Sequence, residues 1–227
     1  MLPKSDTPKF SKDEWNDIFR MRARAFSDRM GWNVKVNEQG HERDQFDNSG
    51  TEYFLCKFGD VPVASLRFIP PFRQRMFDSV FGFETAGWTM GRSPWEVSRI
   101  CSNTQLQPTI RRYCVQLLLV ELMERCVAGD IDSFVGVVYP QTLRTIRLAG
   151  WSGEVIDRLK FNKEDLILSK WYCNEELCRK LKSRHATLNS NMNLLFKYCS
   201  VKSSVLSCAV VKYFQAEMCR AGEQKVA

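Results

Sequence analysis

Apolar residues recur at helical spacing near the start of the sequence. Ser11 and Glu14 form the S-x-x-E pattern of a capping box, which predicts that a helix begins there. Trp15 and Phe26 share one face of that helix, and Arg22 occupies a position on the same face where an apolar residue is expected. Because a buried guanidinium is costly unless it is paired, the pattern predicts a carboxylate partner for Arg22.

Alternating residues farther along predict a β-hairpin. Residues 52–58 and 61–69 flank Gly59-Asp60, a two-residue signal for a hairpin turn. Arg67 on the second strand shares its face with the apolar residues Val61, Val63 and Ile69. It is therefore a second arginine on a face that is expected to point inward.

Residues 94–100 predict the next strand, whose alternation separates two sets of side chains. Glu96 and Ser98 fall on one face of this strand. The other face carries Trp95, Val97 and Arg99. Arg99 is thus a third arginine with apolar neighbours.

The rest of the chain alternates helices with strands. Pro108 and Pro140 are expected to open helices that end at Gly129 and Gly150. We also expect an extended segment over 32–36 after Gly31 and a short helix around 75–83. Two further strands are expected over 131–138 and 164–172. Residues 174–221 are expected to form two helical pieces split near 200–204. This order is typical of an α/β three-layer sandwich around one central mixed sheet. We expect a domain over 1–182 and a basic, helical extension over 183–227.

Composition narrows the class of protein. A chain of 227 residues with 44% hydrophobic residues can bury a full core. It has no apolar run of about 18 residues that would span a bilayer, and the first residues lack the apolar segment of a signal peptide. We therefore expect a cytoplasmic protein with no membrane partner.

Nine scattered cysteines with no C-x-x-C pair, and only two histidines, do not form a zinc site of the usual spacing. We expect reduced thiols, and no metal at Asp44 and Asp47, because two acids without further ligands hold a cation poorly.

The net charge of +7 is concentrated near the C-terminus. Residues 158–227 contain 13 Lys and Arg against 6 acidic residues, whereas the preceding part is neutral. A basic region of this kind suits an acidic protein, a nucleic acid or a membrane surface, or is simply solvated.

Candidate chemistry comes from charged residues on apolar faces. The arginines at positions 22, 67 and 99 need partners, and Asp44 and Asp47 lie in a loop with Phe46 between them. An aromatic and acidic enclosure suits a small organic cation, whereas buried arginines suit a carboxylate or an internal ion-pair network. A ligand that carries both a cation and a carboxylate would use the whole set.

Several motifs in order resemble the acyl-homoserine lactone synthase family of bacterial quorum sensing. They are RMRARAFSDRMGW, ERDQFD, SLRFIP, MFDSVF, WEVSR and LRTIRLAGW, and the resemblance covers about residues 14–170. It implies a fold like the N-acetyltransferases. It also implies a reaction in which the amine of S-adenosylmethionine attacks an acyl thioester on acyl carrier protein. The methionyl carboxylate then closes the lactone and expels methylthioadenosine, so S-adenosylmethionine is a substrate and no cofactor is needed.

Residue roles follow from the resemblance. Glu96 is the expected general base and Ser98 its helper in positioning water or the thioester. The S-adenosylmethionine pocket and its ion-pair network are expected to contain Arg22, Phe26, Trp32, Asp44, Asp47, Arg67 and Arg99. Phe81 and Gly136 are expected in the acyl pocket. The absence of a hydroxyl at Gly136 favours an acyl chain without a 3-oxo group.

An acidic acyl carrier protein also gives the basic surface a partner. The expected docking residues are Arg111, Arg112, Arg144, Arg147, Arg158 and Lys160. The same reaction with acyl-coenzyme A as donor stays open, as does another N-acyltransferase, although residues 102–112 do not resemble a glycine-rich pyrophosphate loop. Nucleic-acid binding by the C-terminal helices would leave the arginines without a purpose and is not expected.

Overall fold

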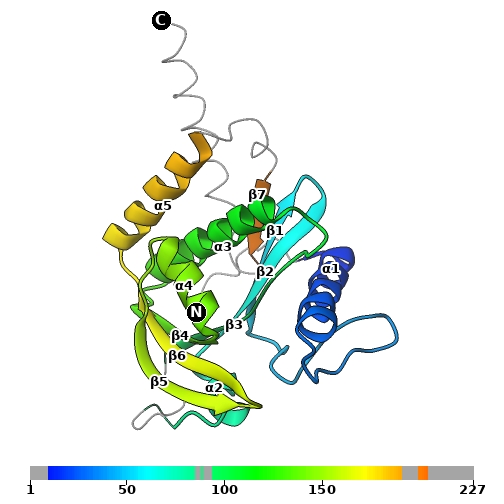
Figure 1. The fold of residues 1–227 in the computed structure, drawn as a ribbon. Helices are drawn as coiled ribbons and strands as arrows, with labels where there is room; N and C mark the ends of the chain where they lie inside the picture. Colours follow the sequence, from blue (N-terminus) through cyan, green and yellow to red (C-terminus); the bar gives the residue numbers. More distant parts are fainter. Residues whose placement is uncertain (1–9, 85–87, 89–93, 191–198, 204–227) are drawn as a thin grey trace, which may run out of the picture.

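The computed structural model describes residues 10–84, 88, 94–190 and 199–203. These residues form one mixed sheet of seven strands in the order β5-β6-β4-β3-β2-β1-β7 (Figure 1). The β3–β4 pair is parallel, and the other pairs are antiparallel. The strands are β1 Glu52–Phe58, β2 Val61–Ile69, β3 Trp95–Ser102, β4 Ser133–Val138, β5 Glu154–Phe161, β6 Glu164–Tyr172 and β7 Cys199–Ser203.

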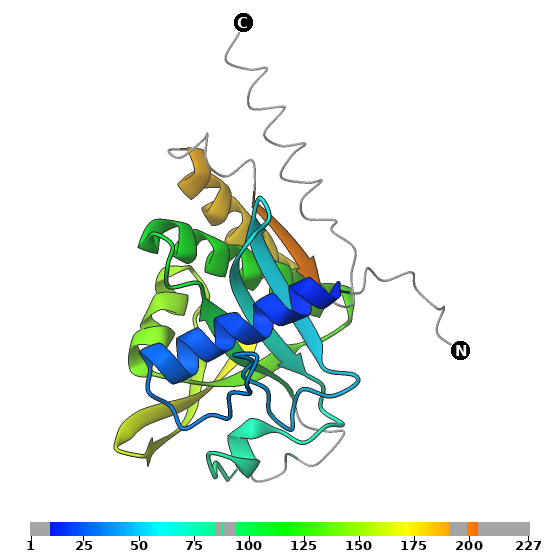
Figure 2. The ribbon, with the colours of Figure 1, turned by 90° about the vertical axis from the view of Figure 1, so that its right-hand side faces the viewer.

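Helices cover both faces of the sheet and produce the expected three layers. In the two views, α1 lies against one face and α3 against the other (Figures 1 and 2). The helices are α1 Lys12–Ala23, the π-helix η1 Arg24–Arg29, α2 Met76–Ser79, α3 Pro108–Ala128, α4 Pro140–Leu148 and α5 Glu175–Ser190. The predicted α/β sandwich is confirmed.

The capping box at the start of α1 is formed as predicted. The Ser11 hydroxyl accepts from the Glu14 backbone N–H at 3.2 Å, and the Glu14 carboxylate accepts from the Ser11 N–H at 2.8 Å. The helix continues through η1 to Gly31, whose φ of +65° ends it. Residues 32–36, expected to be extended, do not form a strand of the sheet, and Val36 makes an isolated antiparallel bridge with Glu42.

Two irregularities in strand pairing change the faces predicted by simple alternation. In β2, Val63 is an extra residue between the pairs Cys56–Ala64 and Lys57–Pro62, so it packs in the α3-side core, away from Arg67. In β3, Arg99 and Ile100 together oppose one residue of β2, which is a β-bulge.

The bulge in β3 corrects the prediction for Arg99. Its φ is +52°, a left-handed conformation that non-glycine residues seldom adopt. The side chain is thereby turned to the α1 side of the sheet, where it meets Glu42 and Asp44. Arg99 therefore shares a face with Ser98, not the opposite face that alternation predicts.

Two strands lie where the sequence predicted none. The mostly exposed strand β5 pairs with β6 through a turn at Asn162 and Lys163, both at positive φ. The strand β7 pairs with β1 at the expected break between two C-terminal helical pieces. Helix α5 runs through position 182, where the domain boundary was placed, and residues 204–227 lie outside the described part of the chain.

Within the described residues, no helix is both long and apolar enough to cross a membrane. The seven cysteines in this part of the chain are free thiols, as predicted for them.

Candidate active site

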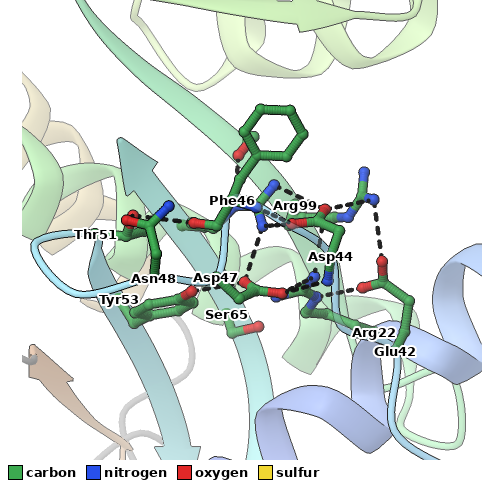
Figure 3. A network of polar contacts seen from close by, with 12 residues as sticks. Arg22, Glu42, Asp44, Phe46, Asp47, Asn48, Thr51, Tyr53, Ser65 and Arg99 are labelled. Carbon is green, nitrogen blue, oxygen red and sulfur yellow. Dashed lines mark hydrogen bonds and ion pairs between the residues drawn. The ribbon is translucent and has the colours of Figure 1, made fainter. Parts of the chain in front are cut away.

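Three arginines and three carboxylates meet on the α1 side of the sheet (Figure 3). Arg22 reaches them from the last turn of α1, and its side chain is 1% exposed. Its Nε lies 2.5 Å from Glu42 Oε2, and its two terminal nitrogens donate to the two oxygens of Asp47 at 2.7 and 2.9 Å. The predicted carboxylate partner of Arg22 is therefore present, and the contact with Asp47 is bidentate.

Arg67 joins the network from the middle of β2. Its guanidinium contacts both oxygens of Asp44, at 2.5 and 3.1 Å, and donates to Asp47 Oδ1 at 2.8 Å. Its Nε donates to the Ser98 hydroxyl at 3.0 Å. Arg67 thus connects the 42–47 loop to β3.

Arg99 completes the set from the bulge in β3. Its Nη2 lies 3.0 Å from Glu42 Oε1 and 2.9 Å from Asp44 Oδ2. Its guanidinium carbon also lies 5.1 Å from the centre of the Phe26 ring and 6.0 Å from that of Trp32. Arg99 therefore lies between the ion-pair network and an aromatic pair.

Sequence reasoning missed Glu42 as a member of the network. Glu42 is 1% exposed and pairs with both Arg22 and Arg99. The signal was charge balance, because three inward arginines cannot be neutralised by Asp44 and Asp47 alone. With Glu42 included, the buried charges balance.

The network favours the charged forms of Asp47 and Arg22. Burial opposes the charge of Asp47, but the hydrogen bonds and charges of Arg22, with Arg67 and Tyr53, outweigh it and hold its pKa below the usual range. The Tyr53 hydroxyl donates to Asp47 at 2.6 Å, and burial together with this carboxylate raises the tyrosine pKa. Burial also opposes the charge of Arg22, yet Asp47 and Glu42 raise its pKa.

Glu96 lies on the same face but outside the ion pairs. It is 1% exposed and accepts a hydrogen bond from the Met76 backbone N–H at 2.7 Å, at the start of α2. Burial raises its pKa to about 8, although the backbone N–H groups of Met76 and Phe77 and the charge of Arg67 act in the opposite direction. Ser98, two residues along β3, is connected to Arg67.

An aromatic wall borders the network. The Phe26 and Trp32 rings are stacked with centroids 5.0 Å apart. The Trp32 indole N–H donates to the Tyr139 hydroxyl at 2.8 Å. Tyr139, which the sequence analysis did not select, immediately precedes α4 at the end of β4.

An apolar cluster lies beside the wall, under the segment that contains α2. Its buried members are Phe77, Phe83, Val135, Leu166 and Leu168. Phe81 packs against it with its ring 5.3 Å from that of Phe161. The structure does not bring Gly136 together with Phe81. A Cβ at Gly136 would meet Val97 Cγ1 at 2.8 Å, in the core cluster that also contains Trp171.

Four of the six expected docking residues lie on α3 and α4, Arg111 and Arg112 near the start of α3 and Arg144 and Arg147 on α4. Arg111 and Arg112 line a cavity of about 250 Å³ between these helices and β3. Arg144 and Arg147 are exposed on α4, whereas Arg158 and Lys160 are exposed on the edge strand β5. In the described part of the chain, no group of three or more His, Cys, Asp or Glu side chains is placed to hold a metal.

Comparison with known proteins identifies the family of this chain. The autoinducer synthase family model matches residues 6–181. An acyl-homoserine-lactone synthase from Rhizobium etli is 26% identical over 191 residues, which cover 82% of this chain and 86% of the relative.

Solved structures show the same fold. The acyl-homoserine-lactone synthase LasI superposes with a TM-score of 0.67 at 22% identity, covering 77% of this chain and 90% of LasI. The structure of BjaI, a coenzyme A-dependent acyl-homoserine lactone synthase with S-adenosylmethionine and isopentyl-coenzyme A, superposes with a TM-score of 0.63 at 18% identity, covering 75% and 81%. The chain therefore belongs to the autoinducer synthase family and is an acyl-homoserine-lactone synthase, a transferase.

Proposed function

We propose that this enzyme joins S-adenosylmethionine to the acyl group of an acyl-acyl carrier protein. The amine nitrogen forms an amide with the thioester carbon, and the carrier thiol leaves. The methionyl carboxylate oxygen then bonds to the γ-carbon as the carbon–sulfur bond breaks, releasing methylthioadenosine and the lactone. The observation that carries this proposal is the buried network of three arginines and three carboxylates beside the Phe26–Trp32 stack and Glu96.

Some residues of the network hold the 42–47 loop against the sheet, and others contact the substrate. Asp47 is 2% exposed and Arg67 1%, and both are committed to ion pairs, so they hold the loop and sheet together. Arg22 has the same structural part, while Asp44 is 13% exposed and borders the pocket. Arg99, at 8% exposed, stands against the two rings and offers its charge to the methionyl carboxylate.

The stacked rings suit the rest of the substrate. Phe26 and Trp32 present aromatic faces that can stack with adenine and can attract a sulfonium through their π-systems. Both rings lie next to Arg99. In the proposed pocket the sulfonium therefore contacts the rings, while the methionyl carboxylate contacts the Arg99 guanidinium.

Glu96 is the proposed general base. A pKa of about 8 matches the ordinary pKa of an α-amine, near 8. Proton transfer from the amine, directly or through one water, is then nearly balanced in free energy, which is the favourable condition for a general base. Ser98, whose hydroxyl accepts from Arg67, positions the water or the thioester.

The acyl chain is proposed to lie against the apolar cluster beside Phe81. An unsubstituted chain stays the proposal, but Gly136 does not bear on it, because a side chain there would point to Val97 and Trp171 and away from this cluster. Mass spectrometry of the products tests this assignment, and a preponderance of 3-oxo lactones would contradict it.

The donor is proposed to dock across α3 and α4. The cavity between these helices is bordered by Arg111, Arg112 and the positive N-terminal end of α3 at Pro108, which favour an anionic partner. Coenzyme A is the second candidate donor, because the similarly folded BjaI depends on it.

The decisive experiment offers the enzyme S-adenosylmethionine with each donor separately. Equal chains are presented as acyl-acyl carrier protein or acyl-coenzyme A, and lactone and methylthioadenosine are detected by mass. We expect stoichiometric lactone and methylthioadenosine with a higher kcat/KM for the carrier protein. Lactone formed only from acyl-coenzyme A would reverse the donor assignment, and no lactone from either would refute the proposed reaction.

A further inference from the structure

Tyr139 stands where three parts of the enzyme meet. It follows the last residue of β4 and precedes Pro140, the first residue of α4. Its side chain is half-buried, with the hydroxyl directed to Trp32 and the ring packed at the edge of the apolar cluster.

The hydroxyl end of Tyr139 fixes the position of Trp32. The indole N–H donates to it at 2.8 Å, across 107 positions of sequence. The two rings also contact, with centroids 6.0 Å apart and planes inclined at 50°. Trp32 lies in a segment without regular strand pairing, so this bond is a tether between that segment and the sheet.

The position of Trp32 matters because the ring is part of the substrate wall. It stacks on Phe26 at 5.0 Å and lies 6.0 Å from the Arg99 guanidinium. A displaced indole would therefore alter both the aromatic face and the surroundings of the charge that faces the methionyl group.

The ring end of Tyr139 belongs to the acyl side. It packs against the apolar cluster together with Val137, Leu159 and Phe161. Burial raises the pKa of the Tyr139 hydroxyl, so it stays protonated at neutral pH and can keep its hydrogen bonds. One side chain thus borders both proposed substrate pockets.

We propose that Tyr139 is a positioning residue that holds Trp32 in the S-adenosylmethionine wall and couples this wall to the acyl pocket. An acyl chain that packs against the ring restricts Tyr139, and the hydrogen bond transmits that restriction to Trp32. Binding in one pocket then strengthens binding in the other, and the effect is reciprocal because it is a coupling free energy. This inference rests on the proposed function.

The first test measures binding of methylthioadenosine by calorimetry, without turnover. Tyr139→Phe removes the hydroxyl but keeps the ring. We expect the dissociation constant to rise about three- to ten-fold, the effect of losing one hydrogen bond, with an unchanged melting temperature. Tyr172→Phe is the matched control, because the Tyr172 hydroxyl also makes one hydrogen bond, to Glu154 at 2.7 Å, on a 48% exposed side chain of β6.

The second test asks whether Tyr139 acts through Trp32. Trp32→Phe keeps an aromatic ring but removes the N–H donor. In the double variant the Tyr139→Phe change should add less than two-fold, because the bond is already lost. Tyr139→His, which retains a polar atom on an aromatic ring, should recover part of the affinity.

The third test measures coupling with an amide-linked octanoyl-pantetheine as the acyl-side probe. At saturation this probe should tighten methylthioadenosine binding a few-fold in the wild type and leave it unchanged in Tyr139→Phe. An effect of Tyr139→Phe below two-fold, full additivity with Trp32→Phe, or equal coupling in both proteins would overturn the inference. Absence of lactone from the wild type would instead refute the proposed function, so the two failures are distinguishable.

Discussion

The two faces of β2 show how one strand serves two purposes. Leu66 and Phe68 point to α3 and belong to an apolar core that also contains Leu118 and Leu122, each at most 1% exposed. Arg67, between them in sequence, points to the α1 side and is equally buried. Side chains on the two faces of β2 are therefore equally buried, but those on the α3 side are apolar and Arg67 on the α1 side is charged.

The difference separates what stabilises the fold from what equips the site. Apolar packing on the α3 face contributes free energy in proportion to the area removed from water. A buried ion-pair network contributes little net stability when intact, but it is costly to break. Substitutions on the α3 face should therefore lower stability in proportion to the apolar area lost. On the α1 face, removing any one charge of the ion-pair network should lower stability sharply.

The largest expected effect comes from Asp47→Asn. The change leaves Arg22 and Arg67 with excess positive charge in a buried site, and we expect a loss of about 3–5 kcal/mol in the free energy of unfolding. Urea denaturation at pH 7 measures it. Because the pKa of Asp47 is lowered by folding, its contribution is present above the ordinary pKa of 3.8 and is lost as pH falls through the lowered folded value.

Glu176→Gln is the control for Asp47→Asn. It removes an acid from an exposed i,i+4 pair with Lys180 on α5. No measurable shift of the urea midpoint is expected, and a shift as large as that of Asp47→Asn would mean that burial does not distinguish the two pairs.

Leu118→Ala tests the other face. Removing a fully buried side chain from α3 should cost about 3 kcal/mol through lost transfer free energy and a residual cavity. Assayed where the variant is still folded, the KM for S-adenosylmethionine should stay within about two-fold of wild type. A ten-fold rise in KM would show that the two faces are not separable.

Glu96→Gln sharpens the comparison within the α1 face. We expect kcat to fall about 100-fold, the lower end for loss of a general base, while urea stability at pH 7 changes little. In the wild type, kcat/KM should rise with pH to a plateau above about 8, as Glu96 loses its proton. The variant should lack this limb, and an unchanged kcat with the same pH profile would remove Glu96 from the mechanism.

The pH dependence of folding stability tests the raised pKa of Glu96 independently of activity. The folded pKa of Glu96, about 8, lies above the ordinary glutamate pKa of 4.5. The native state therefore binds more protons between these values, so the contribution of Glu96 to stability is lost as pH rises from 4.5 to 8.

The smallest expected effect lies on the surface. Charge reversal by Arg112→Glu should raise the KM for acyl-acyl carrier protein about five-fold at low salt and much less at high salt, because exposed charges are screened. The KM for S-adenosylmethionine should not change. Lys180→Glu, 66% exposed on α5 and outside the docking set, is the control.

Much of this architecture was predictable because local patterns determine it. The Ser11–Glu14 capping box, the Gly59-Asp60 turn and the proline and glycine limits of α3 each act over a few residues. The need of Arg22 for a carboxylate followed from burial alone. Its twenty-residue separation from Glu42 did not, since which acid reaches an arginine depends on how the 40–51 loop folds back.

The unpredicted features depend on contacts that local patterns do not contain. β5 is mostly exposed and pairs only because the Asn162–Lys163 turn returns the chain to β6. The Trp32–Tyr139 bond joins residues more than a hundred positions apart. The side-chain direction of Arg99 depends on the register of β2 against β3, which alternation along one strand cannot reveal.

Because of the bulge at Arg99, the number of residues in β3 determines which side of the sheet the Arg99 side chain faces. Two residues there oppose one on β2, so the side chains before and after the bulge keep facing α1 although their numbers change parity. Deleting Ile100 would restore regular alternation and direct the Arg99 guanidinium into the leucine-rich core over α3. Deleting this one apolar residue would thereby move the Arg99 guanidinium from the site into the apolar core, although no charged residue is changed.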